Sequence, residues 1–266
     1  MAARLSSNSA MLRAVAMPAA PSANWAGEPS HVAFLPPPQM GDTFRLLPGY
    51  LPVARRLVHA GDKVYSAGEP FRHLYVLNSG YFKVVCTTAD GREQVVGLHF
   101  RGDWLGFDGI ANRRYGCDAV ALDTGEVWAL QYDALLKACA MHLPLLAALH
   151  TEMSRALTRG RDSMLSRCTL QADARVADFL RDWAAALTRQ GQRADQITLR
   201  VTRAEIGNYL GMTLESVSRA LSTLARGKVI RFAGKGRREI VIPDPLALDA
   251  FIDGDLAVAA RRAQSS

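Results

Sequence analysis

Three polar side chains, Glu215, Ser218 and Arg219, stand at helical spacing in a strongly basic segment near the C-terminus. Their chemistry suits the edges of DNA bases. An Arg guanidinium can donate two hydrogen bonds to guanine O6 and N7, a Glu carboxylate can accept one from the cytosine amino group, and a Ser hydroxyl can bond to several edges. A carboxylate repels phosphates, so Glu215 is better suited to a base than to the DNA backbone.

The surrounding residues predict a helix-turn-helix. Thr202 and Glu205 form a capping-box pattern that opens a first helix, and Gly211 ends that helix where the turn needs a positive φ. Thr213 can cap a second helix, whose expected buried face is Val217, Leu221 and Leu224. Exposed residues near the start of such a second helix read base edges in the major groove. An ordinary helical hairpin with a solvated outer face fits the two helices equally well.

The segment after the second helix favours the DNA-reading interpretation. Residues 229–232 and 239–242 are typical of two short strands around the basic sequence AGKGRR, which predicts a wing. Residues 200–239 carry nine Lys and Arg against three Glu, a balance of +6 out of a net charge of +7 for the whole chain. Such a concentration is expected of a surface that contacts phosphates. The residues expected at the DNA backbone are Thr202, Arg203, Thr213, Lys235, Arg237 and Arg238.

Composition excludes several other classes. No apolar run is long enough to span a membrane, and Arg13 interrupts the only candidate signal-peptide core, so we expect a cytoplasmic protein with no membrane partner. Cys86, Cys117, Cys139 and Cys168 include no CxxC pair, so neither a zinc ribbon nor a ferredoxin-like cluster is expected. We interpret these cysteines mostly as small buried hydrophobes rather than as a disulfide scaffold.

The chain divides by composition and periodicity into five parts. Short β-type runs between glycine turns predict an antiparallel double-sheet roll, and an Ala-, Ser- and Pro-rich start predicts a disordered arm or a mis-assigned start codon. The fold class is therefore α+β, with a jelly-roll-like domain, a long helix and a winged helix-turn-helix. The predicted boundaries are arm 1–40, roll 41–141, long helix 142–170, DNA-binding domain 171–245 and tail 246–266.

The long helix carries an apolar stripe with two interpretations. It can be a spine inside one molecule or a seam between two copies of the chain. Readers of DNA with a helix-turn-helix usually bind paired half-sites as dimers, which favours a homodimer. The residues expected at the dimer seam are Leu146, Leu149, Met153, Leu157 and Met164.

The order of parts resembles the CRP/FNR family of bacterial transcription regulators over about residues 44–242. The likeness is to the FNR branch in two places, GDWLGFD at 102–108 and RAEIGNYLG followed by ESVSR within 203–219. FNR-type regulators use the E-x-x-S-R triplet for TTGAT half-sites arranged as TTGAT-N4-ATCAA. CRP-type readers place an Arg before the Glu and a Gly before the last Arg, where this chain has Leu214 and Ser218. The resemblance implies a dimeric regulator of double-stranded DNA that is not an enzyme.

The resemblance also implies RNA polymerase as a partner. In FNR-like activators the hairpin that corresponds to residues 87–93 faces the polymerase and carries an acidic residue. This chain has Arg92 there instead, so contact through this hairpin stays open.

The chain departs from the family where effectors bind. The oxygen sensor of the FNR branch holds a [4Fe–4S] cluster with an N-terminal cysteine group and one roll cysteine, but residues 1–85 here contain no cysteine and Trp128 stands at the roll position. CRP holds cAMP with a Gly-Glu pair and an Arg-Ser pair. Phe107 replaces that Glu, and Cys117 and Asp118 replace the Arg-Ser pair, so a carboxylate faces the phosphate. We therefore expect neither the cluster nor cAMP, and predict no cofactor.

Two alternatives stay open. Haem bound by His59, His73 or His99 would make the chain a haem- or other small-ligand-binding sensor with weak or non-specific DNA binding. Cys117 or Cys168 could sense oxidation. An enzyme of the cupin type needs clustered His and Glu ligands on neighbouring strands, and the sequence offers no HxH pair in the roll.

Overall fold

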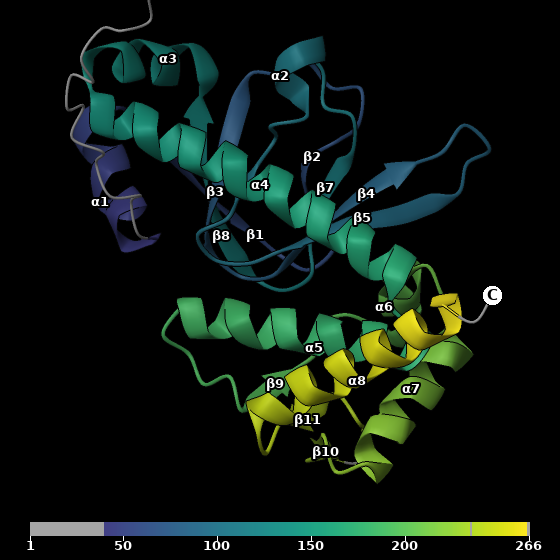
Figure 1. The fold of residues 1–266 in the computed structure, drawn as a ribbon. Coiled ribbons are helices and arrows are strands. Elements are labelled where there is room, and N and C mark those ends of the chain that lie inside the picture. The colour runs from purple at the N-terminus through teal and green to yellow at the C-terminus, as the bar shows by residue number, and fades with distance from the viewer. Residues whose placement is uncertain (1–39, 235, 265–266) are drawn as a thin grey trace, which may run out of the picture. The chain divides into compact units, whose positions relative to one another are not determined.

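The computed structural model describes residues 40–234 and 236–264, and its first part is a β-roll of two four-stranded antiparallel sheets (Figure 1). The strand order is β1-β8-β3-β6 in one sheet and β2-β7-β4-β5 in the other. The strands are β1 (Ala54–Val58), β2 (Lys63–Tyr65), β3 (His73–Ser79), β4 (Phe82–Thr87), β5 (Glu93–His99), β6 (Trp104–Leu105), β7 (Asp118–Ala121) and β8 (Gly125–Gln131). The predicted roll is confirmed. The predicted arm lies outside the described residues except for Met40.

Both faces of β3 are buried in the core of the roll. Four consecutive residues of this strand, Leu74 to Leu77, are buried, whereas a strand with one solvated face would alternate. The second sheet covers one face, and residues of three helices complete the cluster, including Leu47, Leu135 and Leu145. These helices are α1 (Met40–Tyr50), α3 (Tyr132–Met141) and α4 (Leu143–Thr169), and a short α2 (Gly109–Asn112) precedes β7. The sequence does not predict α1, because its helical pattern is short and contains Pro48.

The long helix predicted at 142–170 is confirmed as α4. Pro144 stands in its first turn, where a backbone N–H has no partner within the helix, so the lack of one costs nothing. The proline ring also fixes φ near the helical value. Leu145, Ala148 and Leu149 are buried in the first turns, whereas Leu157 and Met164 are exposed further along. The helix therefore begins as part of the roll core and continues with an uncovered apolar face.

The second core belongs to the winged helix-turn-helix. Its helices are α5 (Ala172–Arg189), α6 (Arg203–Leu210) and α7 (Leu214–Arg226), and its small sheet has the order β10-β11-β9. The strands are β9 (Gln196–Thr198), β10 (Arg231–Phe232) and β11 (Glu239–Val241). Val176, Leu180 and Trp183 of α5 pack in this core. The wing is confirmed, and β9 adds a third strand that the sequence does not predict.

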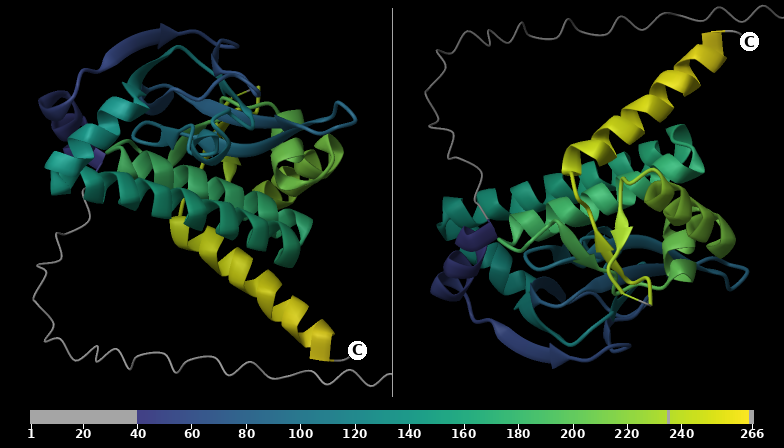
Figure 2. Two further views of the ribbon diagram at one scale, coloured as in Figure 1. Left: turned by 90° about the horizontal axis from the view of Figure 1, so that it is seen from above. Right: turned by 90° about the horizontal axis from the view of Figure 1, so that it is seen from below.

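The predicted tail at 246–266 is wrong, because the structure has a helix there, α8 (Pro245–Gln264). Figure 2 shows it in yellow, leading from the wing sheet to the end of the described chain. Pro245 is the first residue of this helix, a position that its fixed φ suits. Leu248 and Ile252 are buried against the second core, and Arg181 of α5 lies 3.6 Å from Asp249. Within the described residues, no helix is both long and apolar enough to cross a membrane.

Candidate nucleic-acid interface

The predicted helix-turn-helix is confirmed down to its caps. Thr202 Oγ1 accepts a hydrogen bond from the Glu205 amide (3.1 Å), and the Glu205 carboxylate accepts one from the Thr202 amide (2.8 Å), which closes the capping box of α6. Gly211 ends α6 with φ at 68°, and Thr213 Oγ1 accepts from the Ser216 amide (3.2 Å) to open α7. These caps fix the direction in which α7 leaves the turn.

Gly207 is a further requirement of this turn that sequence reasoning missed. A Cβ atom at this position would lie 2.6 Å from the backbone oxygen of Met212, so a side chain would push α6 away from the start of α7. The glycine in the sequence IGNYLG was the available signal, because a glycine inside a helix usually has a packing reason.

The base-reading candidates lie on the outer face of α7. Val217, Ala220 and Leu221 are buried, whereas Glu215 and Arg219 are exposed and Ser218 is half-buried. Hydrogen bonds from its own backbone N–H and from Thr213 hold the pKa of Glu215 below its usual value, and Arg219 adds to this. Glu215 is therefore ionised at neutral pH and can act only as an acceptor, which is the role that a cytosine amino group requires.

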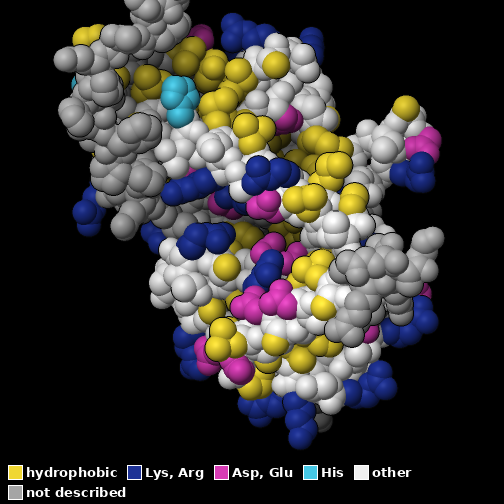
Figure 3. Space-filling model, viewed as in Figure 1, with side chains coloured by type: hydrophobic (Ala, Val, Ile, Leu, Met, Phe, Trp, Pro, Cys, Tyr) yellow, Lys and Arg dark blue, Asp and Glu magenta, His cyan; other side chains and the backbone are white. Residues whose placement is uncertain are grey.

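An open groove of about 600 Å³ follows this face of α7. Lys and Arg side chains gather at the lower edge of the view in Figure 3, over α7 and the wing. Sequence reasoning did not single out the later residues of the groove, although Ser222 and Arg226 stand three and seven residues after Arg219 and so share its face. The lining residues are Ala172, Asp173, Ser216, Ser218, Arg219, Ser222, Thr223 and Arg226.

Arg203 joins α6, α7 and the wing. Its guanidinium lies 3.5 Å from Ser218 Oγ and 3.5 Å from the backbone oxygen of Arg237. Arg203 and Arg237 both stand over the Phe232 ring, at 6.0 and 5.3 Å from its centroid. Burial lowers the pKa of Arg203, and Arg237 adds to this, yet an Arg stays charged at neutral pH. Arg203 thus positions the wing against α7 in addition to its predicted role at a phosphate.

The wing presents Arg237 and Arg238 to solvent, and Lys235 lies outside the described residues. Arg237 has φ at 50°, and its N–H bonds to the Gly234 oxygen (3.2 Å), which forms the tight turn between β10 and β11. The Arg238 oxygen accepts from Leu199, so the backbone is held while the side chain is free to reach outward.

We expect Arg238→Ala to weaken binding to specific and random DNA alike. The side chain is exposed and would contact phosphate, so the slope of log affinity against log salt should fall by about 1. Fluorescence anisotropy at several salt concentrations measures this slope. Arg92→Ala in the roll hairpin is the matched control, because it removes an equal exposed charge away from the interface. An unchanged slope for Arg238→Ala would show that this side chain makes no phosphate contact.

The interior of the roll contains a cluster of buried aromatic side chains. The rings of Tyr65 and Tyr115 stack at 4.0 Å, and those of Tyr65 and Tyr75 at 5.6 Å. Burial raises the pKa of Tyr65, and Asp108 adds to this, so Tyr65 stays neutral. Trp128 packs edge-on against Phe44 and donates from Nε1 to Glu126 (2.6 Å).

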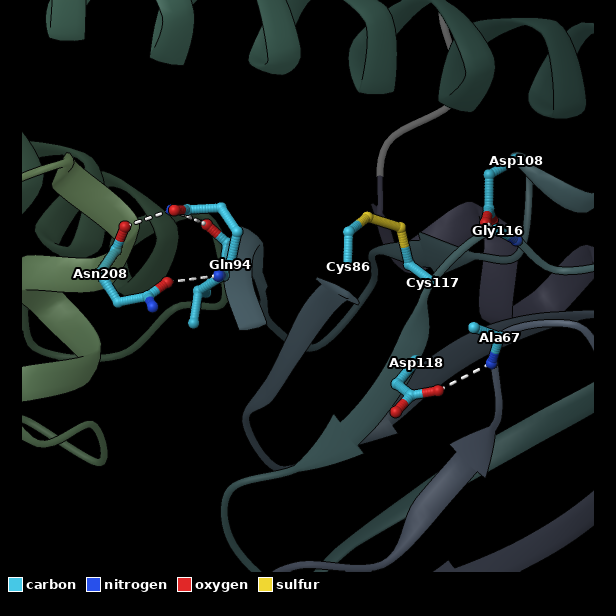
Figure 4. The surroundings of a disulfide bond; sticks show 9 residues. Ala67, Cys86, Gln94, Asp108, Gly116, Cys117, Asp118 and Asn208 are labelled. Carbon is cyan, nitrogen blue, oxygen red and sulfur yellow. Dashed lines mark hydrogen bonds between the residues drawn. A yellow bond between two sulfur atoms is a disulfide. The ribbon is translucent and has the colours of Figure 1, made fainter. Parts of the chain in front are cut away.

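In the segment that the resemblance aligns with the cyclic-phosphate contacts of CRP, two carboxylates accept hydrogen bonds from the chain's own groups (Figure 4). Asp118 accepts hydrogen bonds from the Ala67 amide (2.7 Å) and from Lys63 Nζ (2.6 Å). Asp108 accepts from the Gly116 amide (2.8 Å). Backbone amides and a lysine are the hydrogen-bond donors that an anionic ligand needs. Here each of them donates to a carboxylate, whose negative charge also repels an anion.

The candidate haem histidines have different environments. His59 is exposed and His73 half-buried, whereas burial lowers the pKa of His99 to about 4 against the opposing effect of Asp103, with Arg159 lowering it further. Over the described ranges, no group of three or more His, Cys, Asp or Glu side chains could hold a metal ion.

The interpretation of the cysteines is wrong for three of the four. Cys86 and Cys117 are half-buried and joined by a disulfide, and Cys168 is exposed. Only Cys139 is a buried free thiol, with its pKa raised by burial. The two paired residues are 31 positions apart, so only the strand pairing of the roll brings them together.

Comparison with known proteins agrees with both halves of the fold. Residues 55–142 match the family model for a cyclic nucleotide-binding domain, and residues 174–251 match that for a Crp-like helix-turn-helix domain. The chain is 32% identical over 202 residues to the transcriptional activator protein Anr of Pseudomonas protegens, covering 76% of this chain and 81% of Anr. It is 30% identical over 181 residues to the fumarate and nitrate reduction regulatory protein of Yersinia pestis, covering 68% of this chain and 72% of that protein. The structure of FixK2 from Bradyrhizobium japonicum is similar with a TM-score of 0.68 at 28% identity, covering 75% of this chain and 97% of FixK2.

Proposed function

Because this chain belongs to the CRP/FNR family of DNA-binding transcription regulators, we propose that it binds TTGAT-N4-ATCAA palindromes as a homodimer. The observation that carries the proposal is the outer face of α7, where Glu215, Ser218 and Arg219 stand together at the capped end of the helix. This set of one acceptor, one hydroxyl and one bidentate donor suits a short sequence of mixed bases.

The dimer seam belongs mainly to the second half of α4. Leu149 is only 4% exposed and packs in the roll core, and Leu146 and Met153 are half-buried against the same core. Leu157 and Met164, one heptad apart, are 75% and 65% exposed, and Leu165 next to them is also exposed. An uncovered apolar heptad pair on a long helix favours a two-helix contact, which a second copy of the chain supplies symmetrically.

The same proposal includes DNA binding without an iron–sulfur cluster or cAMP. The stacked tyrosines of the roll and the carboxylates of Asp108 and Asp118 support it, since they use the space and the donors that an anionic effector would need. RNA polymerase is the further partner that we propose. The hairpin between β4 and β5 offers an ion pair of Asp90 with Arg92 (2.7 Å) rather than a free acidic side chain.

A gel-shift assay in air tests the proposal directly. Protein purified aerobically is expected to shift a TTGAT-N4-ATCAA duplex as strongly as protein purified without oxygen when both are assayed at the same thiol–disulfide ratio, and to shift a scrambled duplex much less. The reason is that no set of four thiolates with cluster spacing exists in the sequence. A brown anaerobic preparation that loses its colour and its DNA binding together in air would contradict the proposal, as would equal binding of both duplexes.

A further inference from the structure

The disulfide of Cys86 and Cys117 crosses between two neighbouring strands of the roll. Strand β4 pairs with β7 so that Val85 lies opposite Asp118, and the two cysteines continue this register by one position. Their Cα atoms are 4.5 Å apart, the separation of directly opposed residues in a non-hydrogen-bonded antiparallel pair and within the range of a disulfide. Both side chains are half-buried, so a small thiol in solution can reach the bond.

Cys117 lies in a firmly held segment. The residue before it, Gly116, donates its amide to Asp108 (2.8 Å), and the residue after it, Asp118, binds the Ala67 amide and Lys63. This half of the disulfide is therefore fixed to the roll whether or not the sulfur bond is present.

Cys86 lies beside the strand that contacts α6, the first helix of the helix-turn-helix. It pairs with Gln94 of β5, and the Gln94 side chain donates to the backbone oxygen of Asn208 in α6. The Val95 amide donates to Asn208 Oδ1 (2.5 Å), and Asn208 Nδ2 donates to the Glu93 oxygen (2.8 Å). Figure 4 shows Asn208 and Gln94 facing each other on one side of the disulfide. A salt bridge of Lys83 on β4 with Glu205 on α6 (2.5 Å) adds a further contact.

We propose that Cys86 and Cys117 form a reversible dithiol–disulfide site, and that its oxidised state holds β4 and β5 in the position that binds Asn208 and so raises affinity for palindromic DNA. The DNA effect rests on the function proposed above, whereas the redox chemistry does not. DNA is transcribed where reduced thiols are abundant, and the disulfides that form there are usually transient and often redox-sensing.

The oxidant is a small-molecule disulfide such as oxidised glutathione. The Cys86 thiolate attacks one sulfur of this disulfide, which forms a mixed disulfide and releases one glutathione thiolate. The Cys117 thiolate then attacks the Cys86 sulfur, which forms the protein disulfide and releases the second glutathione. Two electrons pass from the two cysteines to the small disulfide, and the two thiol protons leave with the two glutathione molecules. An excess of reduced glutathione reverses both steps.

The direction of the effect follows from where the contacts lie. The roll contacts Glu205 and Asn208 on α6, whereas the base-reading residues Glu215 and Arg219 are exposed on α7. The contact therefore orders the DNA-binding domain without covering its reading face. A domain that is already ordered before it meets DNA loses less conformational entropy on binding. The oxidised protein therefore binds more tightly.

Equilibration of the full chain in glutathione buffers of graded ratio tests the site. Alkylation and mass analysis should show one transition that gains two labels on reduction, localised to Cys86 and Cys117. Oxidised protein should bind the palindrome at least about fivefold more tightly than reduced protein, the lower end of typical coupling between sites. Hydrogen exchange at the Val95 amide, which donates to Asn208, should be slower in the oxidised state.

Four variants separate the steps. Cys86→Ser and Cys117→Ser should each bind DNA with the affinity of the reduced protein at every glutathione ratio. Cys168→Ser is the matched control, because it removes an exposed cysteine outside the pair and should keep the full redox response. Asn208→Ala should keep the two-label transition but lose the difference in DNA affinity, because it removes the contact through which the disulfide acts.

Two results would overturn the proposal. One is a disulfide that persists at every glutathione ratio until the protein is denatured, which would make it a permanent cross-link. The other is a two-label transition with unchanged Val95 exchange and unchanged affinity. If neither state binds the palindrome, the proposed function fails, and the labelling and Val95 exchange still decide whether the site is redox-active and coupled to α6.

Discussion

Leu157→Asp is expected to give a folded monomer that binds the TTGAT palindrome at least 100-fold more weakly than the wild-type protein. Leu157 is 75% exposed in the single chain, so a carboxylate there costs the isolated fold little. In a symmetric dimer the same substitution places two carboxylates near the two-fold axis, where they repel each other and lose solvent. One subunit then binds one half-site alone and loses the contacts of the second.

Analytical ultracentrifugation and anisotropy measure the two parts of this prediction. Leu246→Asp is the matched control, because Leu246 is similarly exposed on α8 rather than on α4. It should leave both the dimer and palindrome binding intact. If Leu157→Asp sediments as a dimer and binds the palindrome normally, the exposed stripe of α4 is not the seam.

Arg219→Ala is expected to remove the guanine contact in each half-site. One bidentate contact contributes about 1–3 kcal/mol of discrimination, which corresponds to about 5- to 150-fold in affinity for one half-site and more for a palindrome. Binding to random DNA should change little, because that binding depends on phosphate contacts. Competition between cognate and scrambled duplexes measures the ratio.

Arg219→Lys distinguishes the two roles that a cation can have here. Lysine keeps the charge but cannot reproduce the planar two-donor geometry, so cognate affinity should still fall while random binding is kept. Equal losses on both duplexes for Arg219→Ala, together with full rescue by Lys, would show that Arg219 contacts phosphate and reads no base.

The helix-turn-helix could be predicted from the sequence because its signals are local. The box of Thr202 with Glu205, the turn at Gly211 and the cap at Thr213 act within a few residues, and all three occur as predicted. The identity of the exposed residues on α7 follows from the same periodicity. The wing charges are visible in the sequence, but the bridging position of Arg203 between α7 and the wing is not.

Three features could not be predicted from the sequence, because each depends on contacts between residues that are distant along the chain. The pairing of Cys86 with Cys117 depends on the register of β4 against β7, which no local pattern specifies. The burial of Leu149 depends on how α4 meets the roll, because an apolar stripe looks the same whether it covers a domain or a second subunit. Helix α8 forms over a segment with weak periodicity because Leu248 and Ile252 find a core to enter. Local hydrogen bonds and caps determined the DNA-reading element, whereas packing between distant segments determined what surrounds and holds it.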